Sequence, residues 1–416
     1  MNLQKELLLP CGAKLQNRIA KSAMSENMSP KHHAPTKAII HAYKRWADGG
    51  SGLLVTGNIM IDSKAIGEPG NVIVEDKTDF EMLQQWAKAV MGTGAHLWPQ
   101  LNHPGRQAIG AINKEVVAPS SVITKVKGMS ALFAQPRALT EPEILDIIER
   151  FGNTAAILKE AGFTGVQIHG AHGYLVSQFL SPLVNKRTDQ WGGSLENRAR
   201  FVLEVYRNIR KKVGSSFPIG IKINSADFQR GGFTEEESMQ VVQLLEAEGI
   251  DLIEISGGTY EQPAMIGANK KKSTQEREAY FLDYVKKVRK LLKTPLMLTG
   301  GFRTVATMER AIAEGELDVV GLARPFTIFP DLANQIFEGK QSRFDVPIPK
   351  MGLKIIDASG FVETTWHEIH IRRLGEGKKP NPNLSAYSVI GHNLSATMKK
   401  LVFGLPIFKR KTKRGF

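Results

Sequence analysis

The sequence has a single cysteine, Cys11, among 416 residues. One thiol excludes a disulfide within the chain, and it also excludes an iron–sulfur cluster held by several thiolates of this chain. No apolar run is long enough to cross a membrane, and residues 1–10 lack the basic start and apolar core of a secretion signal. We therefore expect a cytoplasmic protein.

A Gly-x-Gly-x-x-Gly motif behind a strand is also missing. Gly92-Thr93-Gly94 is the nearest approach, and it breaks the pattern. A separate nucleotide-binding domain of the Rossmann type is therefore not expected. The length allows one large α/β domain with extensions or two smaller domains.

Net positive charge is low in most of the chain and concentrated at its end. Residues 367–416 hold eleven Lys and Arg against two Asp and Glu, which gives nine of the fourteen net positive charges. The rest of the chain is therefore not expected to bind nucleic acid. The basic end is interspersed with apolar residues, so a weak contact with acidic lipid heads is an alternative to a solvated tail, which we favour. The sequence carries no signal for an oligomeric state.

Strand-like and helix-like segments alternate along the chain. The strand candidates are Ile19–Met24, Gly52–Thr56, His96–Asn102, Thr164–His169, Ile219–Ile223, Leu252–Ser256, Leu296–Thr299 and Asp318–Leu322. The helix candidates are Thr36–Asp48, Asp79–Gly92, Glu141–Ala161, Leu195–Val213, Glu235–Gly249, Arg277–Lys293, Val305–Ala313 and Asp331–Gly339. Eight strands, each followed by a helix, predict an α/β fold with a closed (β/α)8 TIM barrel, and an open sheet is the alternative.

Two long connections interrupt this alternation, at residues 103–140 and 173–195. Both are polar or rich in Pro and Gly, and we expect them to lie over the barrel mouth as lids. The barrel is predicted to comprise residues 1–340. Residues 341–416 would form a C-terminal extension that ends in the basic tail.

A compact group of polar side chains follows the fourth predicted strand. His169 and His172 lie three residues apart, and Tyr174 follows them. These donors could hold a carbonyl oxygen and deliver a proton at one point beyond the strand. A zinc pair or two incidental loop histidines are the alternatives, although no third ligand stands nearby at a metal-like spacing.

Other functional candidates also follow predicted strands, where barrels place their chemistry. Gly300-Gly301 and Arg324 suit a phosphate group, because glycine turns leave N–H groups free and arginine clamps oxygen atoms. With Gln100 and Lys222 on other strands, the set would hold a phosphorylated heterocycle such as flavin mononucleotide (FMN). Lys222 would also suit a Schiff-base aldolase. The paired histidines and Gln100 favour flavin, and a phosphorylated sugar in an aldolase or isomerase is the open alternative.

An ordered series of motifs runs through about residues 17–330. The motifs are Asn17–Ser25, Gln100–Gln107, His169–Leu175, Phe179–Asn185, Arg187–Asp189 and Gly192–Arg198. Together they resemble the old yellow enzyme family, which comprises FMN-dependent NADH:flavin oxidoreductases that act as ene-reductases.

The resemblance implies a role for each candidate residue. The implied cofactor contacts are Ala23, Met24, Ser25 near the reactive edge, Gly57, Gln100, Lys222 near the pyrimidine half, and Gly300, Gly301, Ala323 and Arg324 at the phosphate. His169 and His172 would bind the substrate oxygen, and Tyr174 would donate the proton. No metal is implied.

The resemblance also implies the reaction. NADH or NADPH would give a hydride to FMN, and an α,β-unsaturated carbonyl compound (an enone, enoate or enoyl thioester) would then accept it at the same site. The chain departs from the family pattern at Ser25, where some relatives have cysteine, and at Asn27, where one bacterial branch has tyrosine.

Two rival readings remain. The first is an enzyme similar to the FMN-containing tRNA dihydrouridine synthases, but those use a loop cysteine, whereas Cys11 precedes the first predicted strand. The second is a barrel without redox activity that acts at a membrane surface or as a scaffold.

Overall fold

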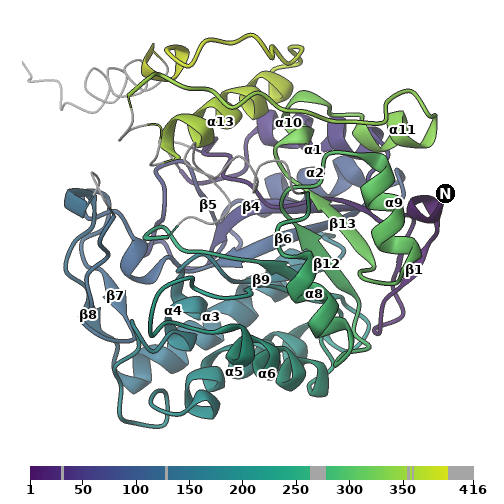
Figure 1. The fold of residues 1–416 in the computed structure, drawn as a ribbon. Coiled ribbons are helices and arrows are strands. Elements are labelled where there is room, and N and C mark those ends of the chain that lie inside the picture. Colours follow the sequence, from purple (N-terminus) through teal and green to yellow (C-terminus); the bar gives the residue numbers. More distant parts are fainter. Residues whose placement is uncertain (30–31, 127–129, 263–277, 354–356, 358–359, 392–416) are drawn as a thin grey trace, which may run out of the picture.

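The computed structural model describes residues 1–416 except 30–31, 127–129, 263–277, 354–356, 358–359 and 392–416 (Figure 1). Eight parallel strands form one ring. They are β3 (Ile19–Lys21), β4 (Leu53–Met60), β6 (His96–Asn102), β9 (Val166–Gly170), β10 (Ile219–Asn224), β11 (Leu252–Ser256), β12 (Leu296–Thr299) and β13 (Val319–Leu322). Pairing of β13 with β3, and of β3 with β4, closes the ring. The predicted (β/α)8 barrel is therefore confirmed.

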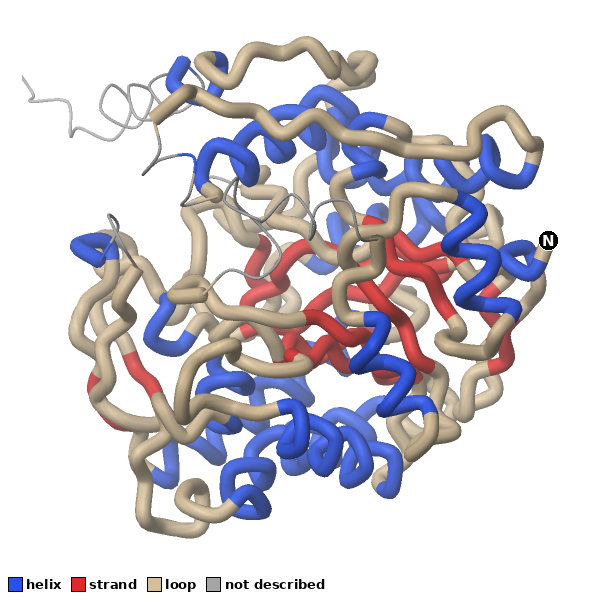
Figure 2. Tube along the Cα trace, viewed as in Figure 1, coloured by secondary structure: helices blue, strands red, loops and turns tan. Residues whose placement is uncertain are grey.

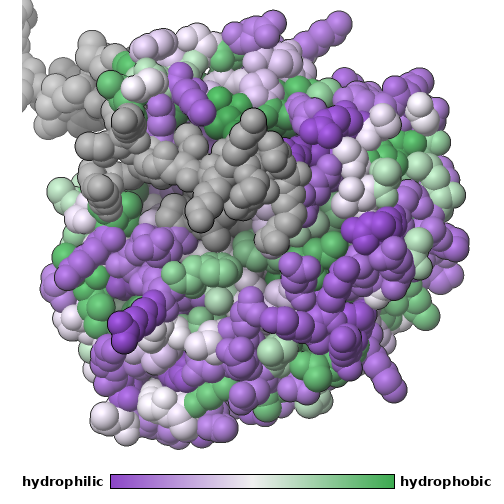
Figure 3. Space-filling model, viewed as in Figure 1, coloured by the Kyte–Doolittle hydropathy of each residue, from purple (hydrophilic) through white to green (hydrophobic). Residues whose placement is uncertain are grey.

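Helices surround the strands (Figure 2). Those anticipated from the sequence are α1 (Lys37–Asp48), α2 (Phe80–Val90), α3 (Glu141–Glu160), α5 (Leu195–Val213), α6 (Glu235–Ala247), α8 (Leu282–Arg289), α9 (Val305–Ala313) and α11 (Leu332–Phe337). Helix α5 shows why they form: Phe201, Val205 and Ile209 recur every four residues and are all buried. The surface over α5 and α6 is mainly hydrophilic (Figure 3).

Several short elements had no clear signal in the sequence. They are the helices α4 (Leu175–Leu180) and α10 (Pro325–Ile328), the 3-10 helices η1 (Asn2–Gln4), η2 (Gly105–Gln107) and η3 (Ser130–Leu132), and strand β5 (Val72–Ile73), which pairs with β4. Helix α8 begins at Leu282, later than expected, and the predicted start at residue 277 lies outside the described residues.

The N-terminal hairpin covers one end of the barrel. Its strands are β1 (Leu7–Leu8) and β2 (Lys14–Leu15). Leu9 and Leu15 are buried against Trp98 and Val319, which belong to barrel strands. This end is therefore filled by apolar packing, and the opposite end, where the strands terminate, is left for a site.

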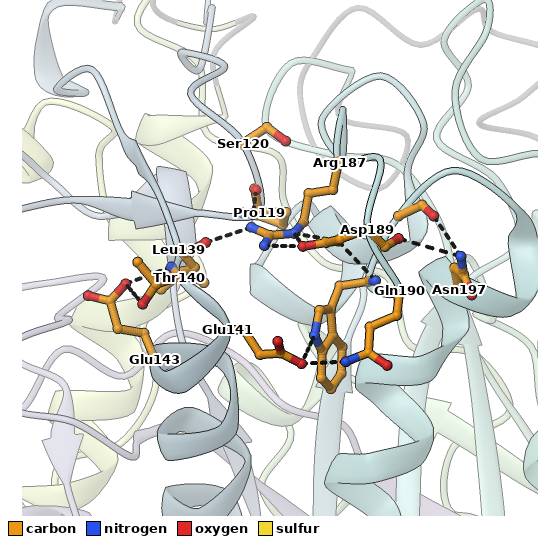
Figure 4. A network of polar contacts seen from close by, with 12 residues as sticks. Pro119, Ser120, Leu139, Thr140, Glu141, Glu143, Arg187, Asp189, Gln190 and Asn197 are labelled. Carbon is orange, nitrogen blue, oxygen red and sulfur yellow. Dashed lines mark hydrogen bonds and ion pairs between the residues drawn. The ribbon is translucent and has the colours of Figure 1, made fainter.

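Hydrogen bonds join the two long connections to one another (Figure 4). The first contains β7 (Val117–Ala118) and β8 (Arg137–Ala138). From the second connection, the Arg187 guanidinium donates to the carbonyl oxygens of Pro119 at 3.1 Å and Leu139 at 2.6 Å, and it pairs with Asp189. The Arg187–Asp189 motif therefore holds these loops in shape.

The described part of the C-terminal extension packs on the barrel. Helix α13 (Phe361–Gly375) contacts α1 and α10, and Trp366 is fully buried in a cluster with Ile328 and Val362. The division at residue 340 stays a prediction. So does the membrane contact of the basic tail, because residues 392–416 lie outside the described residues. No helix in the described part of the chain is long and apolar enough to cross a membrane.

Docking of α13 can be tested at Gly375, where a Cβ atom would stand 2.3 Å from the carbonyl oxygen of Ala38 in α1. Gly→Ala normally stabilises a helix by about 1 kcal/mol. We expect Gly375→Ala instead to lower the free energy of unfolding by about 1–3 kcal/mol, because the backbone of α1 must move. Chemical denaturation measures this change. Gly391→Ala is the control, because its Cβ would meet nothing within 4 Å. Equal midpoints for both variants would contradict the docking.

Candidate active site

A cavity of about 360 Å³ lies where the barrel strands end. All the predicted site residues except Gly57 line it: Ala23, Met24, Ser25, Gln100, His169, His172, Tyr174, Lys222, Gly300, Gly301, Ala323 and Arg324. Within the described parts of the two long connections, only Tyr174 reaches the cavity. The rest of the wall includes residues 344 and 346–348 and helix α13.

Gly57 lies behind the cavity wall. Its N–H donates to Glu26 Oε1 at 3.0 Å, and a Cβ atom would stand 2.6 Å from the carbonyl oxygen of Met24. The neighbouring Asn58 lines the cavity instead. The register of β4 against β6 shifts between Val55 and Asn58, so simple alternation along the strand does not identify the residue that faces the cavity.

The two imidazoles lie together, with ring centroids 5.1 Å apart. Burial, reinforced by Lys222, holds the pKa of His169 well below its usual range and lowers that of His172 to about 3. Both rings are therefore neutral at physiological pH. The N–H of Ala171 donates to His169 Nδ1 at 3.3 Å, so the proton of His169 resides on Nε2, where it can be donated.

His172 is fixed by its backbone and its ring. It has a φ of +60°, and its N–H donates to Asn224 Oδ1 at 3.1 Å. Its Nε2 lies 2.7 Å from Ser256 Oγ. Within the described residues, no group of three or more His, Cys, Asp and Glu side chains is placed to hold a metal ion.

Tyr174 is paired with a second phenol, Tyr260, and their Oη atoms lie 2.7 Å apart. Asn58 Nδ2 donates to Tyr174 Oη at 3.4 Å, and the ring of His169 lies 4.7 Å from that of Tyr174. Burial raises the pKa of both phenols, so both keep their protons at neutral pH. Tyr260 was not predicted, although it follows the glycine-rich end of β11 much as Tyr174 follows β9.

A buried polar network holds Lys222 and Gln100. Lys222 Nζ lies 3.0 Å from Glu254 Oε1, and Glu254 also accepts from Gln167 Nε2 and Thr299 Oγ1, each at 2.7 Å. Gln167 in turn accepts from Gln100 Nε2 at 2.7 Å. The amide nitrogen of Gln100 is therefore engaged within the protein. The sequence signal that could have indicated this network is Glu254, an acidic residue inside an apolar strand.

The turn after β12 and the residues after β13 form a polar corner. Gly300 and Gly301 have φ values of +128° and +91°, and a Cβ atom on Gly301 would stand 3.1 Å from the ring of Tyr280. Among the described residues, none accepts a hydrogen bond from the backbone N–H of Gly301 or Arg324. The Arg324 guanidinium pairs with Glu363 of α13, which was not predicted. Free N–H groups beside an arginine fit a phosphate.

The model of the NADH:flavin oxidoreductase / NADH oxidase family matches residues 11–343. The chain belongs to this family. It is therefore an NAD(P)H-dependent flavin oxidoreductase with FMN as its cofactor, as the sequence predicted. The site fits this cofactor, because one cavity joins the phosphate corner to Lys222 and Gln100.

Similar proteins agree with this assignment. NADH-dependent flavin oxidoreductase iliE of Hypocrea jecorina (strain QM6a) is 38% identical over 372 residues, which cover 83% of this chain and 92% of that protein. Cinnamate reductase of Clostridium sporogenes is 30% identical over 331 residues, which cover 73% of this chain and 48% of that protein. The structure of 2-naphthoyl-CoA reductase with 2-naphthoyl-CoA has a TM-score of 0.78 at 28% identity, covering 90% of this chain and 57% of that chain.

The neutral state of the two imidazoles gives a pH prediction. We expect the nitrogen NMR signals of His169 and His172 to stay unchanged between about pH 5 and 8, with His169 as the Nε2–H tautomer. An unfolded chain would protonate them near pH 6.5, whereas folded His172 does so at about 3. Their contribution to stability is therefore complete above about pH 6.5 and is lost as the pH falls further. A titration midpoint near 6.5 in the folded protein would contradict the buried, neutral pair.

Proposed function

We propose that this chain is an ene-reductase, which uses hydride from NAD(P)H to reduce the carbon–carbon double bond of an α,β-unsaturated carbonyl compound at one shared site. The observation that carries the proposal is the meeting of neutral His169, neutral His172 and protonated Tyr174 at one cavity. Such a set can bind a carbonyl oxygen and supply a proton without any change of charge beforehand.

Bound FMN supplies the centre that accepts hydride from the nicotinamide and passes it on. The phosphate would lie against Gly300, Gly301, Ala323 and Arg324. Lys222 and Gln100 would contact the ring system. The positive charge of Lys222 favours electron gain there, and Glu254 keeps that charge in position.

Ala23, Met24 and Ser25, which follow β3 and line the same cavity, would also contact the ring system. His169 Nε2–H and the ring of His172 would hold the substrate oxygen, which draws electrons from the double bond. Tyr174 would then give its proton to the α-carbon. Tyr260 and Asn58, which contact Tyr174 Oη, would stabilise the phenolate that remains.

The substrate is proposed to be an enone, an enoate or an enoyl thioester. The names of cinnamate reductase and 2-naphthoyl-CoA reductase support carbonyl compounds conjugated to a double bond or to an aromatic ring. The cavity volume falls within the range of small-molecule sites.

A reaction like that of the dihydrouridine synthases needs a catalytic cysteine, and no cysteine lines this cavity. Cys11 follows β1 and packs with the apolar cluster at the other end of the barrel, and its N–H donates to Asp251. Burial raises the pKa of its thiol to about 11. The only thiol of the chain is thus neither at the cavity nor reactive at neutral pH.

The proposal is tested first by flavin absorbance and anaerobic titration. We expect the purified protein to carry FMN, to be reduced by NADH or NADPH, and to be reoxidised by members of a panel of enones, enoates and enoyl thioesters. A colourless protein after incubation with FMN would favour the barrel without redox activity. Reduction without reoxidation by any member of the panel would contradict the ene-reductase proposal.

Tyr174→Phe tests the proton donor. We expect reoxidation by an unsaturated substrate to slow by about 10²–10⁴-fold, because general acid catalysis contributes that much. Reduction by NAD(P)H should be unaffected, since it needs no proton from this phenol. Stopped-flow absorbance separates the two half-reactions. Tyr387→Phe, an exposed position on the extension, is the control. An unchanged rate of reoxidation in Tyr174→Phe would remove this residue from the mechanism.

A further inference from the structure

The hydroxyl of Ser25 lies between two carboxyl groups from distant parts of the chain. Ser25 Oγ is 2.6 Å from Glu68 Oε2 and 2.7 Å from Glu368 Oε1. Glu68 belongs to the segment between β4 and β5, and Glu368 to helix α13. Ser25 and Glu68 both line the cavity, so this arrangement borders the flavin site.

The single hydroxyl hydrogen of Ser25 requires one of the two carboxyl groups to be protonated. A serine hydroxyl has one hydrogen, and an ionised carboxylate only accepts. If both Glu68 and Glu368 were ionised, one of the two contacts would bring oxygen lone pairs together at 2.7 Å or less without a hydrogen. If one is a carboxylic acid, it donates to Ser25 Oγ, and Ser25 donates to the other. The second of these bonds has a charged acceptor, and both distances lie within the range of O–H···O hydrogen bonds.

The surroundings of Glu68 favour retention of this proton. The negative charge of Glu26 and the phenols of Tyr174 and Tyr260 face it, and the hydrogen bond that Asn71 Nδ2 donates at 3.3 Å acts in the opposite direction. Burial is the main cause of the raised pKa of Glu68, and Glu26 adds to it.

Among the described residues, the cation near Glu368 is Arg372. Arg372 lies one turn further along α13 and contacts the carbonyl oxygen of Asn27 at 3.4 Å, while the Asn27 side chain bonds Glu368. Burial, followed by the charge of Glu68, raises the pKa of Glu368 to about 8. Within the described part of the chain, Arg372 is thus the cation that faces these two buried acids, and one positive charge is too little to ionise both.

We propose that Glu68 and Glu368 share one proton through Ser25 and act as positioning residues that keep the charge beside the flavin at one negative unit. The effect on the flavin rests on the proposed function, whereas the shared proton does not. The hydroxyl hydrogen of Ser25 is committed to a carboxylate, so Ser25 does not donate to the flavin. Loss of the shared proton at high pH would add a second negative charge, which opposes electron gain at the flavin.

Infrared spectroscopy tests the shared proton. At neutral pH the holoprotein should show the C=O band of a carboxylic acid. In Glu68→Gln the new amide can donate to Ser25, so Glu368 ionises and the band disappears. Glu368→Gln should remove the band for the same reason. Glu376→Gln, whose carboxylate pairs with Lys378 at the surface, should keep it.

A band that survives either Glu68→Gln or Glu368→Gln would overturn the sharing, as would its absence from the unaltered protein. If one variant does not fold, the other carries the test alone. If the protein binds no FMN, the proposed function fails, and the infrared result still decides whether the proton is shared.

The flavin midpoint potential tests the consequence for the cofactor. The unaltered protein and Glu368→Gln carry the same charge at the pair near neutral pH, so their potentials should agree there. Above about pH 8 the potential of the unaltered protein should fall below that of Glu368→Gln, because only the unaltered protein can lose the shared proton. If the potentials of the two proteins change in parallel over the whole pH range, the pair has no link to the flavin.

Discussion

Closure of the sheet between β13 and β3 determines where the functional groups lie. Pairing of Gly321 with Ala20 and of Leu322 with Lys21 brings the first strand beside the last, although about three hundred residues separate them. The residues after β3 and after β13 therefore border one cavity from adjacent positions. An open sheet would leave Ser25 and Arg324 at opposite edges, with no common cavity between them.

A closed ring also brings polar residues into an apolar interior, and here they form a hydrogen-bonded network around Glu254. Glu254 accepts from Lys222, Gln167 and Thr299, so its charge is compensated where water cannot reach. Removal of a single partner would leave a buried charge or amide unsatisfied. The same network fixes Gln100, so Lys222 and Gln100, two of the proposed contacts with the flavin ring, stand on one rigid base.

The sequence predicts the barrel and most of the cavity, because both follow from local patterns. Apolar runs mark the strands, and polar residues directly after them mark the site. Other features depend on geometry that no local pattern carries. The register shift in β4 places Asn58 at the cavity instead of Gly57, and the approach of two loops brings Tyr260 to Tyr174. Glu368 reaches Ser25 only because α13 docks on the barrel.

The position of α13 has a consequence for the order in which the site is assembled. All eight strands of the barrel precede α13 in the chain. The family model ends at residue 343, before this helix begins. During synthesis from the N-terminus, the ring can thus close while one wall of the cavity has not yet left the ribosome. The nascent barrel would present a more open cavity to its cofactor, and arrival of α13 would complete one side of that cavity.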